Sequence, residues 1–258
     1  MKKYEQFVCL SGLPRSGSTL LSAILSQNPK IHSEGNSAVC QLMWDMLQSC
    51  NINCKEQITA NQRQSTIFEL ISSIPEIYYN KIDVNEKIIV DKCRSWTIPE
   101  NIEVLKTFID KDIKIIVLER PITEIVNSFM KLYNKNNIQL NVDNLLEPFK
   151  EPIMRSLNGV IHAKNNNIDN TYLFISYKEL IETPEETIKK IYDFCGWEYF
   201  EHDYKNILQK YPEHDEIYGL TGFHDVFPEI KKNISEIILD ETIISKCKMI
   251  ETTLSLNK

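Results

Sequence analysis

The sequence has no long apolar stretch and little glycine. None of its 258 residues lies in a run near the ~18 consecutive apolar residues that cross a bilayer. The first apolar run, residues 7–10, is also too short for the core of a signal peptide. With only seven glycines, the chain contains no low-complexity linker. We therefore expect a cytoplasmic protein that makes no membrane contact.

Clusters of positive charge and of metal ligands are missing as well. The net charge is −7, and lysines and arginines group only in pairs such as Lys231 and Lys232, which argues against nucleic-acid binding. The seven cysteines are odd in number and scattered. Cys50 and Cys54 are closely spaced, but there is no second pair to complete a metal site. We expect reduced thiols, no metal and no nucleic-acid partner.

What the sequence does contain is a set of four apolar runs separated by helix-length segments. The runs cover residues 7–10, 88–90, 113–118 and 172–175, and only Lys114 interrupts them. Apolar runs of this length are typical of strands buried on both faces of a parallel sheet, and helical spacing follows three of them. The sequence predicts an α/β, three-layer P-loop-type fold with a central, mainly parallel sheet flanked by helices. We expect one domain over residues 1–258.

Three further segments have less regular patterns. Residues 37–80 are mostly helical in pattern and form an insertion between the first and second predicted strands, whereas residues 134–150 are polar and predict a loop. Residues 200–258 have few clear periods. We expect segments 37–80 and 200–258 to cover the ligand site. Before the last segment, Pro184 opens a predicted helix that Gly196 ends.

A glycine-rich loop follows the first predicted strand and precedes a helix. Gly12 and Gly17 have the spacing of a Walker-type phosphate loop, whose backbone N–H groups and helix N-terminus bind an anion. Position 18, which is lysine in an NTPase, is serine, and the loop's cation is Arg15 instead. The alternative is a plain strand-to-helix turn. The residues expected to bind phosphate are Pro14, Arg15, Ser16, Gly17, Ser18 and Thr19.

A second anion site is indicated at the end of the third predicted strand. Arg120 lies at that strand's carboxyl end, Pro121 is placed as the first helical residue, and Ser128 follows Arg120 by eight positions. Ligands of open α/β sheets bind outside the carboxyl ends of the strands. An arginine fork with a nearby hydroxyl suits a terminal phosphate. The alternative is a solvated arginine and an ordinary helix serine.

Both motifs resemble those of one enzyme family. Residues 11–29, SGLPRSGSTLLSAILSQNP, resemble the 5′-phosphosulfate loop of sulfotransferases that use 3′-phosphoadenosine-5′-phosphosulfate (PAPS), particularly the bacterial and tyrosylprotein branches. Arg120 and Ser128 resemble the family's 3′-phosphate motif. The resemblance covers about residues 7–199, and it implies sulfuryl transfer from PAPS to a hydroxyl or amine. Because no basic groove is evident in the sequence, we expect the acceptor to be a small molecule. The product is 3′-phosphoadenosine-5′-phosphate (PAP), and no metal is required.

The same resemblance suggests roles for residues outside the two motifs. Lys92 matches a lysine that reaches the sulfuryl group or the bridging oxygen, so Arg15 and Lys92 would stabilise charge during transfer. Tyr177 matches a tyrosine that packs near the adenine or the 3′-phosphate, although a structural role is equally consistent. Asp91 resembles a Walker B acid and favours the alternative of a P-loop kinase. The third possible function is a non-catalytic module that binds PAP.

The general base is where the resemblance fails. Tyrosylprotein sulfotransferases have a catalytic glutamate at the position of Asn36, and asparagine accepts no proton near neutral pH. We expect Glu34 to serve instead, because Arg15 and Lys92 would keep it ionised. A solvated glutamate with no catalytic role is the alternative. His32 and a His224-Asp225 pair are the next candidates.

Overall fold

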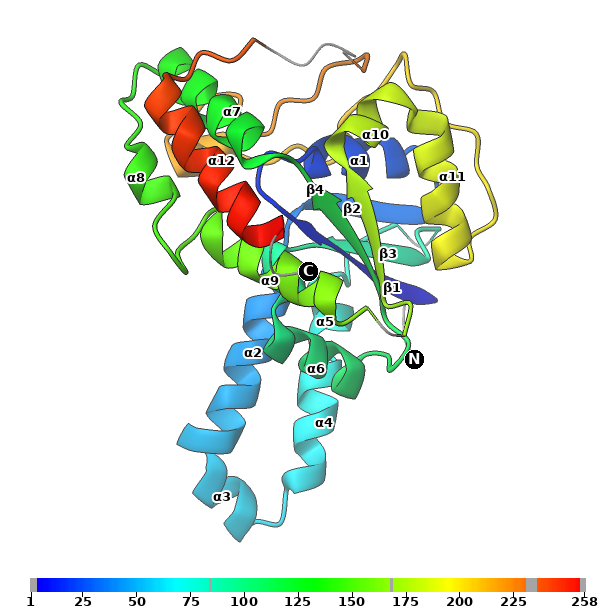
Figure 1. The fold of residues 1–258 in the computed structure, drawn as a ribbon. Coiled ribbons are helices and arrows are strands. Elements are labelled where there is room, and N and C mark those ends of the chain that lie inside the picture. The colour runs from blue at the N-terminus through cyan, green and yellow to red at the C-terminus, as the bar shows by residue number, and fades with distance from the viewer. Residues whose placement is uncertain (1–3, 84, 168, 231–235, 256–258) are drawn as a thin grey trace.

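The computed structural model describes residues 4–83, 85–167, 169–230 and 236–255. Within these residues, five parallel strands form one sheet in the order β2-β3-β1-β4-β5 (Figure 1). The strands are β1 (Gln6–Gly12), β2 (Ile31–Asn36), β3 (Ile88–Lys92), β4 (Lys114–Glu119) and β5 (Tyr172–Ser176). The predicted parallel α/β sheet is confirmed, and each of the four apolar runs lies on a strand.

Helices cover both faces of the sheet (Figure 1). One face is covered by α1 (Ser18–Leu25), α10 (Tyr177–Glu182) and α11 (Pro184–Cys195). The other face carries α2 (Val39–Gln48), α6 (Pro99–Phe108), α7 (Ile122–Lys135), α9 (Met154–Asn165) and α12 (Glu241–Ser255). The shorter elements are α3 (Lys55–Ala60), α4 (Gln64–Ser72), α5 (Ile74–Tyr78), α8 (Val142–Leu145), the π-helix η1 (Ser49–Asn53), and the 3-10 helices η2 (Arg94–Thr97) and η3 (Asp215–Tyr218). None of the described helices is long and apolar enough to cross a membrane.

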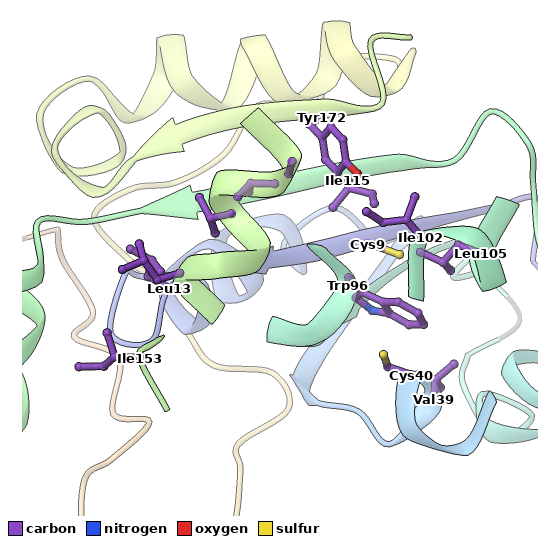
Figure 2. Close-up of a cluster of buried hydrophobic side chains, with 14 of the residues drawn as sticks. Cys9, Leu13, Val39, Cys40, Trp96, Ile102, Leu105, Ile115, Ile153 and Tyr172 are labelled. Carbon is purple, nitrogen blue, oxygen red and sulfur yellow. The ribbon is translucent and has the colours of Figure 1, made fainter. Parts of the chain in front are cut away.

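Successive residues of the central strand β1 supply the two hydrophobic layers. Val8 and Leu10 pack with α1 and α11, while Cys9 packs on the opposite face, in a cluster that includes Trp96 and Cys40. Figure 2 shows part of this second cluster, with the Trp96 ring between Cys9 of the sheet and Cys40 of α2. A strand that is buried on both faces has apolar residues at successive positions. This pattern is why β1 could be predicted from the sequence.

Several local expectations are corrected. The sequence analysis missed β2, because the strand IHSEGN has one aliphatic residue, at Ile31, and lies at the sheet edge. Pro121 is the N-cap of α7, with ψ 137°, rather than its first helical residue. The stretch 134–150, expected to be a loop, contains the end of α7 and the helix α8. Residues 200–258 contain the helix α12.

Residues 37–80 contain the helices α2, α3, α4 and α5 and the π-helix η1, and they follow β2 rather than β1 directly. In Figure 1, α2, α3 and α4 extend away from the sheet as a long hairpin. The prediction around Pro184 and Gly196 also holds: α11 begins at Pro184, and Gly196 is its C-cap, with φ 70°. Left-handed backbone of this kind is where glycine is favoured over residues that have a Cβ.

The strand register brings the predicted site residues to one edge of the sheet. Leu10 of β1 lies beside Lys92 at the end of β3, and Gly12 lies beside Leu118 of β4. Because all strands are parallel, their carboxyl ends share this edge, which is where ligands of open α/β sheets bind. The loops that leave β1, β3, β4 and β5 therefore meet here.

Candidate active site

The loop between β1 and α1 has the backbone geometry that its glycines predict. Gly12 has φ 127°, and a Cβ there would lie 2.1 Å from the carbonyl oxygen of Leu118. Gly17 is the N-cap of α1, with φ 94°. Arg15, at the crown, also has left-handed backbone, with φ 58°. This conformation is costly for a residue with a Cβ, and such residues concentrate at functional sites.

The six predicted loop residues face in different directions. Pro14, Arg15, Ser18 and Thr19 line a cavity above the sheet edge, as does Gly17. The Ser16 hydroxyl is buried and donates to the Leu13 carbonyl, so this side chain closes the loop internally. Ser16 can therefore offer a ligand its backbone N–H but not its hydroxyl.

The structure brings four of the predicted residues together from four elements. Arg15 Nε donates to the Ser128 hydroxyl of α7 at 3.1 Å, and Arg120 Nη1 donates to the Arg15 carbonyl at 2.8 Å. The Arg120 guanidinium also lies 3.9 Å from the ring centroid of Tyr177, at the start of α10. Burial, followed by the charge of Arg120, lowers the pKa of Arg15. Two guanidiniums held this close are suited to bind an anion, and Arg120 Nε is also paired with Glu124 at 3.0 Å.

Lys92, at the end of β3, lies deeper in the same cavity and is paired with a carboxylate. Its ammonium is 2.8 Å from Glu213 Oε1, and the Asn36 N–H is 3.4 Å from Glu213 Oε2. Gly35 makes room for this carboxylate, because a Cβ there would lie 2.2 Å from Glu213 Cγ. Burial lowers the pKa of Lys92, and the Glu213 charge offsets part of that effect.

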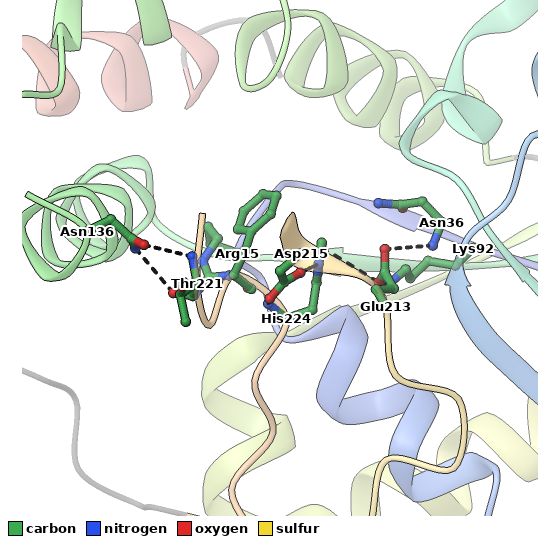
Figure 3. Close-up of polar contacts among 9 residues, drawn as sticks. Arg15, Asn36, Lys92, Asn136, Glu213, Asp215, Thr221 and His224 are labelled. Carbon is green, nitrogen blue, oxygen red and sulfur yellow. Dashed lines mark hydrogen bonds and ion pairs between the residues drawn. The ribbon is translucent and has the colours of Figure 1, made fainter. Parts of the chain in front are cut away.

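A histidine continues the chain of contacts that Figure 3 shows. His224 Nδ1 lies 2.6 Å from Asp215 Oδ1, the His224 backbone N–H donates to Asp215 Oδ2 at 2.9 Å, and His224 Nε2 is 3.7 Å from Glu213. The partner of His224 is thus Asp215 rather than Asp225, whose carboxylate is 3.4 Å from Lys135. His224 lies close to both Lys92 and the loop crown.

The segment that carries these groups is fixed to the loop and to α7. Arg15 donates to the Phe223 carbonyl, and its guanidinium carbon is 5.4 Å from the Phe223 ring centroid. The Thr221 N–H donates to Asn136, the C-cap of α7, at 2.7 Å. Residues 213–225, which we call the covering segment, therefore close one side of the site (Figure 3).

Glu34, the base predicted from the sequence, lies apart from this arrangement. It belongs to β2, and its Oε2 is 3.2 Å from His32 Nε2. His32 is buried and also bonds Glu86 at 2.8 Å; burial lowers the pKa of His32, but Glu34 and Glu86 outweigh it and raise the pKa overall. Glu34 lines a separate hollow of about 10 Å³ with Thr19, not the main cavity.

The main cavity has a volume of about 1040 Å³ and is lined by Arg15, Lys92, Arg120, Ser128, Tyr177 and His224. That volume is at the upper end of what one drug-sized ligand fills. An apolar part of its wall comes from α7, α8 and the covering segment, with Phe129, Leu132, Leu145, Tyr218, Leu220 and Phe223. Residues 218–230 contribute to the wall, whereas none of residues 37–80, all of which the structure describes, does.

Comparison with known proteins identifies the family. The model of the sulfotransferase family matches residues 8–201. The chain belongs to the sulfotransferase family. None of the curated proteins matches this sulfotransferase. Solved structures do match it, and they show which fold it has.

Three solved structures share the fold of this sulfotransferase. The sulfotransferase domain from the curacin biosynthetic pathway has a TM-score of 0.58 at 17% identity, covering 97% of this chain and 96% of that chain. A sulfotransferase from Alicyclobacillus acidocaldarius has a TM-score of 0.54 at 12% identity, and the match covers 97% of this chain and 92% of that chain. Retinol dehydratase, in complex with androsterone and the inactive cofactor PAP, has a TM-score of 0.52 at 16% identity, and the match covers 96% of this chain and 80% of that chain. The protein is a sulfotransferase enzyme, and its chemistry is sulfuryl transfer.

Asp91, the one residue that favoured a kinase, has structural partners in this sulfotransferase. Its carboxylate is fully buried and accepts bonds from the Tyr79 hydroxyl at 2.8 Å and from the Trp96 indole at 2.6 Å. Asp91 is not among the residues that line the cavity. Among the residues that the structure describes, no group of three His, Cys, Asp or Glu side chains could hold a metal ion.

Sequence reasoning missed Glu213 and Asp215. Glu213 is 121 positions from Lys92, so no local motif links the two residues. The available signal was compositional: four consecutive ionisable residues, 213–216, precede two glycines within a segment that has no helical period.

Proposed function

We propose that this sulfotransferase uses PAPS as its donor and transfers the sulfuryl group to a hydroxyl or amine of a small molecule in the cytoplasm. The observation that carries the proposal is the convergence of Arg15, Arg120, Ser128 and Tyr177 at the phosphate loop. A loop alone suits any phosphate. A second arginine with a hydroxyl and an aromatic ring beside it suits a donor that has a separate 3′-phosphate and an adenine.

The residues divide the chemistry between two ends of the donor. The backbone N–H groups of the loop and the Thr19 hydroxyl hold the 5′-phosphate, as in other helix N-terminal anion sites. Arg15 and Lys92 stabilise the negative charge that develops on the bridging oxygen and on the departing phosphate. A sulfuryl group carries less charge than a γ-phosphate, so these cations suffice without a metal. For Lys92 to act, it exchanges its Glu213 partner for the donor.

A small-molecule acceptor is supported by the cavity itself. Its volume of about 1040 Å³ leaves room beside a nucleotide, and its wall includes apolar side chains such as Phe129, Leu145 and Leu220. Retinol dehydratase, which has the same fold, holds androsterone beside PAP. No basic groove for a polysaccharide is evident in the sequence, whose net charge is −7.

PAP should stabilise the protein more than AMP does, without any divalent metal. The 3′-phosphate adds the contacts of Arg120 and Ser128, and a ligand that binds only the folded state raises the melting temperature according to its affinity. Thermal unfolding with PAP, AMP, and ATP with Mg²⁺ measures this. Equal shifts with PAP and AMP, or a shift confined to ATP with Mg²⁺, would contradict the donor assignment.

Replacing Arg120 with alanine should weaken PAP binding by ~1.5–3 kcal/mol, the loss expected for a charge-assisted contact. AMP lacks the 3′-phosphate, so its affinity should barely change. Calorimetric titration of both nucleotides measures the difference, with the exposed Arg63→Ala as the matched control. Arg120 also bonds the Arg15 carbonyl, so the melting temperature of each variant is recorded first. Equal losses for PAP and AMP would show that Arg120 does not read the 3′-phosphate.

A further inference from the structure

A pair of cysteines lies beside the site, between the end of β3 and the start of α2. The Ser37 N–H donates to the Lys92 carbonyl at 3.0 Å, and the buried Asp91 carboxylate accepts a bond from the Ser37 side chain. These bonds hold the first turn of α2, which contains Cys40, against the strand end that leads into Cys93. The two reduced thiols are hydrogen-bonded, with the Cys40 S–H donating to the Cys93 sulfur.

The two cysteines differ in their access to the main cavity. Cys93 is partly buried and lines the cavity together with its neighbours Lys92 and Arg94. Cys40 is only 4% exposed and is not among the lining residues. Figure 2 shows the Cys40 sulfur pointing from α2 toward Trp96. A small reagent in the cavity therefore reaches Cys93 directly, whereas Cys40 lies behind it.

The hydrogen bond between the thiols also decides which of them is the more reactive. It raises the pKa of Cys40 and lowers the pKa of Cys93. Burial and the Asp91 carboxylate oppose the lowering at Cys93, whereas the Arg94 charge adds to it. In contrast, burial raises the pKa of the core cysteine Cys195 to about 12. Because the thiolate is the nucleophilic form of cysteine, Cys93 is suited to react and Cys40 to resolve the product.

We propose that Cys40 and Cys93 form a redox-sensitive dithiol, which hydrogen peroxide converts to a disulfide beside Lys92 and which thereby slows transfer. The Cys93 thiolate attacks one peroxide oxygen and is oxidised to a sulfenic acid. The O–O bond breaks, and the other oxygen leaves as hydroxide, which the solvent protonates. The Cys40 sulfur then attacks the sulfenic sulfur, and the departing hydroxide takes the Cys40 proton. Two thiols and one peroxide give one disulfide and two water molecules.

The disulfide acts on transfer through the end of β3. The Cys93 N–H donates to the Leu10 carbonyl at 3.0 Å, so the backbone of Cys93 belongs to the sheet edge at the site. A covalent bond draws the two sulfurs closer than a hydrogen bond does, and it therefore pulls this edge toward α2. Lys92 directly precedes Cys93, and a displacement of ~1 Å in such a group costs up to ~100-fold in rate. This step rests on the proposed function, in which Lys92 acts on the donor.

The test treats the reduced, full-length protein with hydrogen peroxide and maps its peptides without reduction. The peptides that contain Cys40 and Cys93 should become linked with the loss of two hydrogen atoms, and dithiothreitol should reverse the link. In Cys40→Ser, the sulfenic acid should persist on Cys93, where dimedone traps it. In Cys93→Ser, neither product should form. Cys54→Ser is the matched control, because Cys54 is exposed and lies outside the cavity, and it should behave as the wild type.

Transfer and stability are measured on the same samples. The oxidised wild type should transfer label from PAPS to an acceptor selected from a small-molecule library ~10–100-fold more slowly, and dithiothreitol should restore the rate. Its melting temperature should rise by about 5–10 °C, because the link constrains the unfolded chain, so the lost rate is not a loss of fold. Transfer by Cys93→Ser should not respond to peroxide. PAP should slow the formation of the link, because it fills the cavity that leads to Cys93.

The outcomes distinguish this inference from the proposed function. If the link forms but PAP neither binds nor slows it, the donor assignment fails and the dithiol stands. If peroxide modifies Cys54 while Cys40 and Cys93 remain unlinked, the dithiol is refuted. A dimedone adduct that is missing from Cys93 in Cys40→Ser refutes Cys93 as the reactive thiol. A linked protein that transfers at the full rate refutes the control of transfer by this pair.

Discussion

Replacing Lys92 with methionine should lower kcat by ~10²–10³, the cost of removing one group that stabilises charge in the transition state. The same change should destabilise the fold, because Glu213 would lose the cation that lies 2.8 Å away. Breaking a buried ion pair from one side costs ~3–5 kcal/mol. Transfer of label from PAPS to an acceptor selected from a small-molecule library, and unfolding in denaturant, measure the two effects.

The double variant Lys92→Met with Glu213→Gln separates these losses. It leaves no uncompensated carboxylate, so stability should largely return while turnover stays low. The exposed Lys30, paired with Glu198 at 3.2 Å, provides the matched control: Lys30→Met should change neither stability nor kcat appreciably. If the double variant regained turnover, Lys92 would contribute to folding and not to transfer.

Replacing Gly12 with alanine should prevent normal folding. The new Cβ would lie 2.1 Å from the Leu118 carbonyl oxygen, on backbone with φ 127°. The atoms that would clash belong to the backbones of two paired central strands. Gly12 of β1 lies beside Leu118 of β4, and the Leu13 N–H donates to the Leu118 carbonyl at 2.9 Å. Neither side can move without separating β1 from β4. We expect a loss of more than ~4 kcal/mol, which is exceptional for one methyl group.

Gly196→Ala is the control for backbone strain alone. Its φ is also positive, at 70°, but nothing lies within 4 Å of the added Cβ. Gly196→Ala should lower the free energy of unfolding by ~1–2 kcal/mol, because a residue with a Cβ is less stable in left-handed backbone. Melting temperatures and soluble yields of the two variants measure the contrast. Similar losses at the two positions would show that the close approach of β1 to β4 has no special cost.

The sheet was predictable because its central strands are buried on both faces. Residues such as Val8 and Cys9 pack in opposite layers, so the run stays apolar throughout. The edge strand β2 could not be found this way, because its serine, glutamate, glycine and asparagine have low β-propensity. The helix α12 was missed because its pattern is weak and follows a stretch without periodicity.

The convergence of the residues proposed to bind the donor was predictable for a different reason. Arg120 and Tyr177 directly follow a strand, and Arg15 lies in the loop that leaves β1; parallel strands bring those positions together. Their convergence therefore follows from local motifs and the strand order. Glu213 and His224 lie in a segment whose position depends on contacts with residues more than a hundred positions away, such as Lys92. Nothing local in the sequence encodes those contacts.

The cavity wall is thus assembled from two stretches of chain with unequal sequence signatures. The loop and strand ends lie within residues 8–201, which the family model matches, whereas the covering segment lies beyond them. Under the proposed function, the part that the family model matches contains the donor site. We expect a relative with the same loop and a different covering segment to keep the nucleotide and to change the molecule that is sulfated. Exchange of residues 213–225 between homologues is accordingly the natural way to redirect this enzyme.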